Sequence, residues 1–216
     1  MRAPLVVGFD LDMTLVDSRP GIAAAFRALT ARTGVYVDAD AAVARLGPPL
    51  REELRLWFPP DAVESAVTTY RALYPEHAIA PCAALPGAAD AIAAVRAHGG
   101  KVIVITSKLG RLAKLHLDHL GLVVDGVAGD RFAAGKQAAI TEFGIRVYVG
   151  DHVADMVAAR AAGVPGVGVA TGPCSRDELI QAGASAALTD LTRFPDWLDT
   201  AVTAHGIRLG RPATDG

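Results

Sequence analysis

Two carboxylates, Asp10 and Asp12, stand at the end of a short apolar run at residues 5–10, and Thr14 adds a hydroxyl just after them. An apolar run of this length that contains β-branched residues predicts a buried strand. Two carboxylates at the end of such a strand are costly unless a positive charge lies against them. The simplest such charge is a metal ion, and the pair would then be a site for chemistry.

A second group of polar residues follows the next predicted strand, at residues 101–106. Thr106 ends this strand and is followed by Ser107 and Lys108. A hydroxyl at a strand end, beside exposed backbone N–H groups, is suited to holding a phosphoryl oxygen. Lys108 would favour an anionic substrate, as would Arg111 a little further on.

A lysine and two more aspartates complete the set. Lys136 opens a helix-like segment, where it could neutralise both paired carboxylates and a bound phosphate. Asp151 directly follows a predicted strand at residues 146–150, and Asp155 lies four residues later, on the same face if a helix begins there. Oxygen ligands without a dedicated set of histidines favour Mg²⁺ over zinc or copper.

The elements that must position these residues alternate between strands and helices. Further strands are predicted at residues 123–128 and 166–170, and helices at residues 88–98 and 110–120. Strands that are apolar on both faces and separated by helices imply a parallel sheet covered on both sides. We therefore expect an α/β fold with a doubly wound parallel sheet.

One interval, residues 20–82, breaks this alternation. It contains no convincing strand, and helical patterns lie at residues 22–33, 39–46, 50–57 and 62–73. An interval of this length is too long for a simple crossover, so it predicts a small all-helical domain above the end of the first strand, where ligands bind in such sheets. We expect a core of residues 1–17 and 83–204, a helical cap of residues 18–82, and a flexible tail at 205–216.

Composition limits the class of protein. The chain has 216 residues, of which 51% are hydrophobic and 20% charged, and its formal net charge is −2. These values predict a globular protein with no basic surface for nucleic acid or membranes. Two cysteines, Cys82 and Cys174, with no leader or long apolar segment, favour the reducing cytoplasm.

The ordered motifs resemble those of the haloacid dehalogenase-like hydrolase superfamily. The resemblance rests on Phe-Asp-Leu-Asp-Met-Thr-Leu around Asp10, on Thr106 and Lys136, and on the Gly-Asp-x-x-x-Asp motif with Asp151 and Asp155. Three stretches resemble the phosphoglycolate phosphatase-like branch: Leu-Val-Asp-Ser at 15–18, Leu-Gly-Pro-Pro-Leu at 46–50 and Thr-Ser-Lys at 106–108. The chain departs from the pattern at Met13, where glycine is usual, and at Gln137, where proline often follows the lysine.

The resemblance implies a phosphatase that uses Mg²⁺. Asp10 would attack phosphorus to form an aspartyl-phosphate, and Asp12 would protonate the leaving alkoxide and then activate water. The metal would be held by the Asp10 carboxylate, the Asp12 carbonyl and Asp151, with support from Asp155. Thr106 and Lys136 would bind the phosphoryl oxygens, and the helical insert, which resembles a C1-type cap, would exclude water and choose the substrate.

Further candidate substrate contacts are Thr14, Ser107, Lys108 and Arg51, the last standing just after the Gly-Pro-Pro turn. The expected partner is a small phosphorylated metabolite such as phosphoglycolate, a nucleotide or a sugar phosphate, and the expected state is a monomer or homodimer. His116 and His119 lie three residues apart with no third ligand in view, so a metal site there is not favoured.

Two alternatives stay open. A sugar phosphomutase of the β-phosphoglucomutase kind would use the same two aspartates, and a non-catalytic binding or regulatory module would keep a vestigial site. A dehalogenase is disfavoured, because those members of the superfamily lack the second aspartate, which is present here as Asp12.

Overall fold

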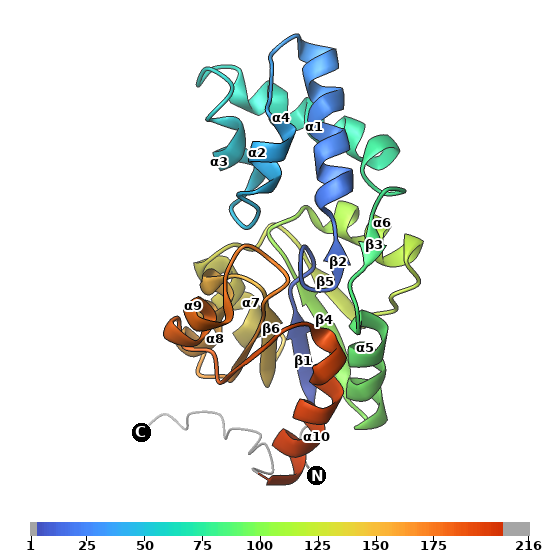
Figure 1. The fold of residues 1–216 in the computed structure, drawn as a ribbon, viewed down its shortest axis with the longest axis vertical. Coiled ribbons are helices and arrows are strands. Elements are labelled where there is room, and N and C mark those ends of the chain that lie inside the picture. Colours follow the sequence, from blue (N-terminus) through green and yellow to red (C-terminus); the bar gives the residue numbers. More distant parts are fainter. Residues whose placement is uncertain (1–3, 205–216) are drawn as a thin grey trace.

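The computed structural model describes residues 4–204, and a six-stranded parallel sheet forms its centre (Figure 1). The strands follow the spatial order β5-β4-β1-β6-β7-β8, so β1 lies in the middle, between β4 and β6. Their bounds are β1 Val6–Phe9, β4 Lys101–Ile105, β5 Gly126–Ala128, β6 Val147–Gly150, β7 Gly166–Val169 and β8 Ala186–Leu188. Since all strands run parallel, their carboxyl ends meet along one edge of the sheet.

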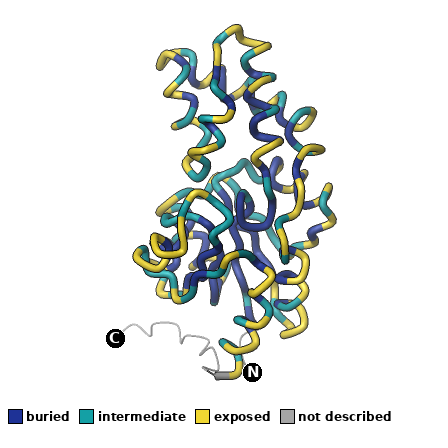
Figure 2. The backbone as a smooth tube through the Cα atoms, viewed as in Figure 1, coloured by how far each residue is buried: buried dark blue, intermediate teal, exposed yellow. Residues whose placement is uncertain are grey.

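Helices cover both faces of this sheet. One core packs α5 (Ala88–Ala97), α6 (Gly110–His119) and α10 (Phe194–Ala204) against side chains such as Val7 and Phe9, and a short 3-10 helix, η1 (Leu191–Arg193), precedes α10. The opposite face carries α7 (Ala134–Glu142), α8 (Val153–Ala161) and α9 (Arg176–Gln181). Figure 2 shows the resulting buried centre beneath exposed helical surfaces.

Four helices form a separate group beyond the carboxyl edge of the sheet (Figure 1). They are α1 (Arg19–Thr33), α2 (Ala39–Val43), α3 (Leu50–Leu54) and α4 (Val63–His77), and we call residues 19–77 the helical unit. The unit has its own apolar core, in which Phe26 and Leu29 of α1 pack with Tyr70 and Tyr74 of α4. The chain enters and leaves it through a two-stranded antiparallel ribbon, β2 (Val16–Asp17) and β3 (Ala83–Ala84).

The structure confirms the predicted fold class, a parallel sheet covered on both sides. Most predicted elements are present with ends shifted by a few residues. The sequence analysis did not identify β8, an Ala-Ala-Leu strand without β-branched residues, nor α9 and α10. The tail predicted at residues 205–216 lies outside the described residues. Within residues 4–204, no helix is long and apolar enough to cross a membrane.

Candidate active site

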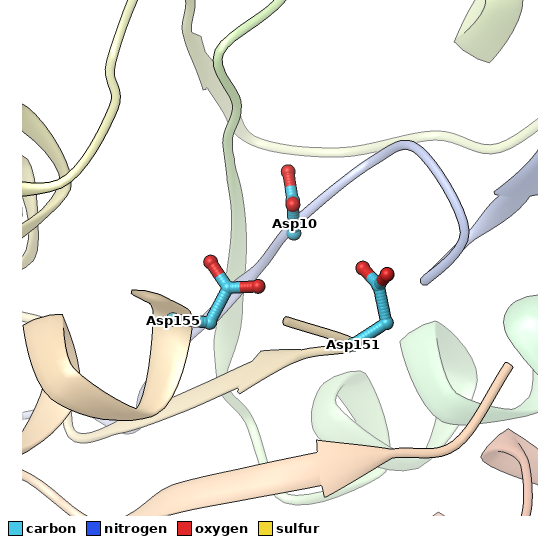
Figure 3. Close-up of side chains that lie close together, drawn as sticks. All are labelled: Asp10, Asp151 and Asp155. Atoms are coloured by element: carbon cyan, nitrogen blue, oxygen red, sulfur yellow. The ribbon is translucent and has the colours of Figure 1, made fainter. Parts of the chain in front are cut away.

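Three buried aspartates meet at the carboxyl edge of the sheet. Asp10 directly follows β1, Asp151 directly follows β6, and Asp155 lies in the first turn of α8 (Figure 3). One carboxylate oxygen of each lies within 4.8 Å of the others, and each residue is at most 8% exposed. The structure thus brings together three of the four aspartates that the sequence analysis assigned to the metal.

Backbone contacts fix the position of this cluster. Asp10 donates its N–H to the carbonyl of Val149 over 2.8 Å, which joins the ends of β1 and β6. Asp155 closes a capping box, because its Oδ2 accepts the N–H of His152. Gly150 leaves room for this carboxylate, since a Cβ there would lie 2.4 Å from Asp155 Oδ2. The carboxylates are therefore held by the sheet and by a helix N-terminus.

Lys136 supplies the positive charge closest to these carboxylates. Its Nζ lies 2.7 Å from Asp10 Oδ2 and 2.5 Å from Asp155 Oδ1, and its side chain is 5% exposed. Burial opposes its charge, but Asp10 and Asp155 raise the pKa of Lys136 well above its usual value. The lysine therefore stays protonated and offers a fixed cation beside the nucleophile candidate.

The electrostatics of the cluster favour a divalent cation. Burial, and then the charge of Asp155, raise the pKa of Asp10 to about 7, despite Lys136. Burial and the charges of Asp10 and Asp155 raise the pKa of Asp151 well above its usual value. A single lysine thus leaves three crowded carboxylates under-compensated, and their oxygen-only donor set suits Mg²⁺. The residues present therefore fit the expected metal.

Asp12 points to a different set of groups. Its Oδ1 lies 2.8 Å from Nζ of Lys108, and this lysine lowers the pKa of Asp12 although burial opposes the shift. Lys108 also donates to the hydroxyl of Tyr74 over 2.5 Å, and that hydroxyl lies 2.9 Å from Nε2 of His116. Tyr74 belongs to α4, so a residue of the helical unit helps to hold the lysine against Asp12.

His116 is fully buried in this chain of contacts. Burial, followed by the charge of Lys108, lowers the pKa of His116 to about 4, so the imidazole is neutral at physiological pH. A neutral ring can accept the Tyr74 proton at Nε2 while Tyr74 accepts from Lys108. His116, for which the sequence analysis did not favour a metal site, is thus linked to Asp12 through Tyr74 and Lys108.

The candidate hydroxyls lie in different environments. Thr14 donates to Oδ1 of Asp151 over 3.0 Å, so it orients a carboxylate of the cluster. Thr106 is fully buried, and its Oγ1 accepts the N–H of Lys108 over 3.1 Å. Ser107 donates to the carbonyl of Gly47 over 3.3 Å, between the core and the helical unit. The predicted contacts of these hydroxyls with a substrate stay predictions.

A turn with unusual backbone geometry connects Asp12 to Thr14. Met13 has φ 59°, in the left-handed region that glycine adopts most readily. The turn is held by Thr171, whose hydroxyl donates to the carbonyl of Met13 over 2.5 Å. A residue with a side chain adopts this conformation less readily than the glycine that is usual at this position of the motif. The hydrogen bond from Thr171 helps to hold Met13 in it.

A cavity of about 530 Å³ lies between the aspartates and the helical unit. Asp10, Asp12, Lys108 and Lys136 line its base. Arg51 lines its far wall, where its guanidinium pairs with Glu64 over 2.6 Å and does not meet the aspartates. The predicted contact of Arg51 with the substrate stays a prediction.

Sequence reasoning missed several residues that the fold brings to this site. Tyr74 and His116 could not be assigned because their roles depend on how α4 packs against the core. Gly172 was also missed: a Cβ there would lie 1.8 Å from Asp151 Oδ2, so the residue must be glycine for this carboxylate to keep its place. No local signal in the sequence marks this close approach.

Comparison with known proteins gives the same picture. A family model described as haloacid dehalogenase-like hydrolase matches residues 7–169. A phosphoglycolate phosphatase from Rhodospirillum rubrum is 32% identical over 220 residues, which cover 90% of this chain and 91% of that protein. The tyrosine-protein kinase PtkA from Mycobacterium tuberculosis is 32% identical over 185 residues, 79% of this chain and 64% of the relative.

The chain therefore spans less than two thirds of the length of the mycobacterial relative. Among solved structures, a haloacid dehalogenase-like family hydrolase from Streptococcus pneumoniae superimposes with a TM-score of 0.79. The two share 22% sequence identity, over 92% of this chain and all of the other, so this likeness concerns the fold.

Proposed function

The chain belongs to the haloacid dehalogenase-like hydrolase family, and on this basis we propose that it is a Mg²⁺-dependent phosphatase acting on a small phosphomonoester. The observation that carries the proposal is the division between two aspartates at the base of one cavity. Asp10 lies among the carboxylates that fit a metal, whereas Asp12 lies outside that cluster, against Lys108. This division suits a nucleophile beside a proton carrier.

In the first half of the reaction, a carboxylate oxygen of Asp10 attacks phosphorus, and the bond from phosphorus to the ester oxygen breaks. The leaving alkoxide takes a proton from Asp12. Because Lys108 holds Asp12 ionised in the free protein, the incoming phosphate must first compete for Lys108. Once Lys108 is drawn to the phosphate, Asp12 can be protonated, and it then gives this proton to the leaving alkoxide.

In the second half, the ionised Asp12 takes a proton from water, and the resulting hydroxide attacks phosphorus of the aspartyl-phosphate. The acyl phosphate bond breaks, phosphate leaves, and Asp10 is regenerated. Lys108 then pairs again with Asp12, which favours the ionised form that this step requires.

The other residues bind and orient. Lys136 and Thr106 would hold phosphoryl oxygens, although Thr106 is fully buried before substrate enters. Asp10, Asp151, Asp155 and the Asp12 carbonyl would hold Mg²⁺, which when bound offsets the repulsion between the nucleophile and the phosphate oxygens. Thr14 would keep Asp151 in place through its hydrogen bond.

The helical unit would act as a cap that excludes water and selects the substrate. It forms one wall of the cavity and contacts the core close to the site, through Ser107 to Gly47 and Lys108 to Tyr74. A small phosphorylated metabolite fits this space, and the absence of nucleic-acid and membrane partners stays a prediction. The cytoplasmic location and the monomeric or homodimeric state stay predictions.

The decisive experiment is phosphate release from a panel of phosphomonoesters, with Mg²⁺ and with a chelator. Replacing Asp10 with Asn should lower Mg²⁺-dependent turnover by about 10³-fold or more, because the amide is a poor nucleophile. Circular dichroism should show that the variant remains folded. Turnover that persists in a folded Asp10→Asn variant would remove Asp10 from the role of nucleophile.

The same assay separates the alternatives. With a hexose 1-phosphate, release of phosphate supports a phosphatase, whereas isomerisation without release supports a phosphomutase. Because one relative is named a tyrosine-protein kinase, transfer of phosphate to a tyrosine-containing protein should be measured as well. A vestigial binding module would release no phosphate from any ester on the panel.

A further inference from the structure

The cavity extends well beyond the space that a phosphate group needs. At about 530 Å³ it lies within the range of sites that hold drug-sized ligands, roughly 300–1,000 Å³. Its base holds the aspartates and lysines, and its upper part is lined by apolar side chains that include Ile22, Phe26, Val67 and Leu112. A two-carbon acid esterified to phosphate would leave most of this apolar surface without contact.

Aromatic side chains form one wall of the upper part. The rings of Phe26 and Tyr70 lie 4.8 Å apart between centroids, and those of Tyr70 and Tyr74 lie 5.5 Å apart. All three residues line the cavity and are at most 4% exposed. Such a wall favours stacking or edge contacts with a ring of the substrate.

The upper part offers no cation that lacks a carboxylate partner among the described residues. The arginines that line it are each paired: Arg45 with Glu53 at 2.6 Å, Arg51 with Glu64 at 2.6 Å and Arg71 with Asp130 at 3.2 Å. The Arg45 pair is the most firmly held, because Glu53 also accepts from Nε of Arg45 and from the indole N–H of Trp57. A second anionic group on the substrate would therefore have to displace an existing partner.

One polar group in the wall is available. The hydroxyl of Tyr70 makes no hydrogen bond with any other described residue, although the side chain is 4% exposed and lines the cavity. The oxygen is accessible from the cavity, so it can donate a hydrogen bond to an acceptor atom of a ligand. Tyr70 thus marks where a substrate atom with a lone pair would gain a contact.

We propose that the substrate is the monophosphate ester of a neutral, ring-bearing alcohol, with the ring against the aromatic wall and an acceptor atom at the Tyr70 hydroxyl. The inference rests on the proposed phosphatase function and narrows its substrate. It separates this chain from the activity named for its Rhodospirillum relative, whose substrate, phosphoglycolate, is a carboxylate with two carbons. Burying the ring is favourable, whereas burying an unpaired carboxylate is costly.

The first test compares kcat/KM for three esters of primary alcohols: 2-phosphoglycolate, 2-phenylethyl phosphate and thymidine 5′-monophosphate. The two ring-bearing esters should exceed phosphoglycolate by about a hundredfold, the gain expected from burying the surface of one ring. Equal or higher kcat/KM for phosphoglycolate would overturn the inference and leave the phosphatase assignment intact.

A matched pair of variants tests the hydroxyl. Tyr70→Phe should raise KM for thymidine 5′-monophosphate about threefold to tenfold relative to 2-phenylethyl phosphate, which has no acceptor beyond its phosphate. Tyr36→Phe removes the same group from a residue of the connection between α1 and α2 that is 70% exposed, and should change neither value. An unchanged ratio in Tyr70→Phe would refute the assigned contact.

Binding to the Asp10→Asn variant separates failure of the inference from failure of the proposed function. Calorimetry should rank 2-phenylethyl phosphate above 2-phosphoglycolate even where no turnover occurs. If the wild-type protein hydrolyses nothing but the ranking holds, the phosphatase proposal fails and the ligand class stands. If phosphoglycolate binds the variant more tightly, the ligand class is wrong.

Discussion

The two ends of the cavity are built on different electrostatic principles. At the sheet end, the carboxylates of Asp10, Asp151 and Asp155 crowd around Lys136, so each charge depends on its neighbours. At the helical end, each arginine that lines the cavity is paired with its own carboxylate, and much of the remaining wall is aliphatic or aromatic. Shared charges suit the metal binding and phosphoryl transfer that we propose for the sheet end. Because the arginines at the helical end are already paired with carboxylates, we expect substrate selection there to depend on shape and apolar contact.

This difference predicts how each end responds to substitution. Removing one member of a shared cluster leaves several buried charges uncompensated, whereas removing one member of an exposed pair affects only its partner. Large effects on stability and turnover should therefore concentrate at the sheet end. Effects at the helical end should be smaller and should depend on the substrate.

The largest effect on stability is expected from Lys136→Met. Without the lysine, Asp10 and Asp155 lose their buried cation, and the free energy of unfolding of the metal-free protein should fall by about 3–5 kcal/mol. Urea unfolding measures this loss, and added Mg²⁺ should restore part of it. Lys114→Met, which breaks an exposed pair with Asp118, should cost less than about 1 kcal/mol. Equal losses of unfolding free energy in the two variants would contradict the distinction between a shared buried cluster and an exposed ion pair.

The dependence of stability on pH should come next. Because the pKa of Asp10 is raised to about 7 in the folded protein, the folded state binds more protons than the unfolded state between about pH 4 and pH 7. The free energy of unfolding of the metal-free protein should therefore fall as pH rises through this window, and Asp151 should add to the fall.

Thermal unfolding across this range, with a chelator present, measures the fall. Mg²⁺ should oppose it by displacing protons from the carboxylates. Asp10→Asn should flatten the profile, because it removes one titrating group and one cause of the raised pKa of Asp151. A profile that rises with pH in the metal-free wild type would contradict the assigned charge states.

The boundary between the two ends is tested by Tyr74→Phe. The change removes the hydroxyl that joins Lys108 to His116, so Lys108 should hold its place against Asp12 less well. We expect kcat to fall by about tenfold with little change in KM, the cost of one buried hydrogen bond to a charged group. Adding Lys108→Ala to Tyr74→Phe should then cost less than Lys108→Ala costs in the wild type, because both act on the same contact. Additive losses would mean that the tyrosine acts elsewhere.

The smallest effect is expected from Arg51→Ala. Its guanidinium is paired with Glu64, and both side chains are more than half exposed, at 51% and 66%. We expect kcat/KM to change by less than about threefold, in line with the small value of exposed pairs. A loss of tenfold or more would instead establish the substrate contact predicted from the sequence.

The sequence predicted the sheet end far better than the helical end. Asp10, Asp12 and Asp151 could be placed because a buried strand has a clear pattern and parallel strands end at one edge. Tyr74 and His116 could not, since a helix residue reaches the site only through tertiary packing. Lys108 was identified as a candidate for the substrate, and only the fold reveals its pairing with Asp12.

The ribbon of β2 and β3 has a consequence for how such proteins diversify. Val16 pairs with Ala84 and Asp17 with Ala83, so the chain leaves the core and returns to it at adjacent positions. The residues between β2 and β3 can therefore be exchanged for another segment while the two ends of the segment stay at the same adjacent positions. Under the proposed function, recombination at these two points would transfer the whole unit that selects the substrate from one relative to another. Chimaeras made in this way would test whether the core keeps the proposed reaction while the helical unit changes the substrate.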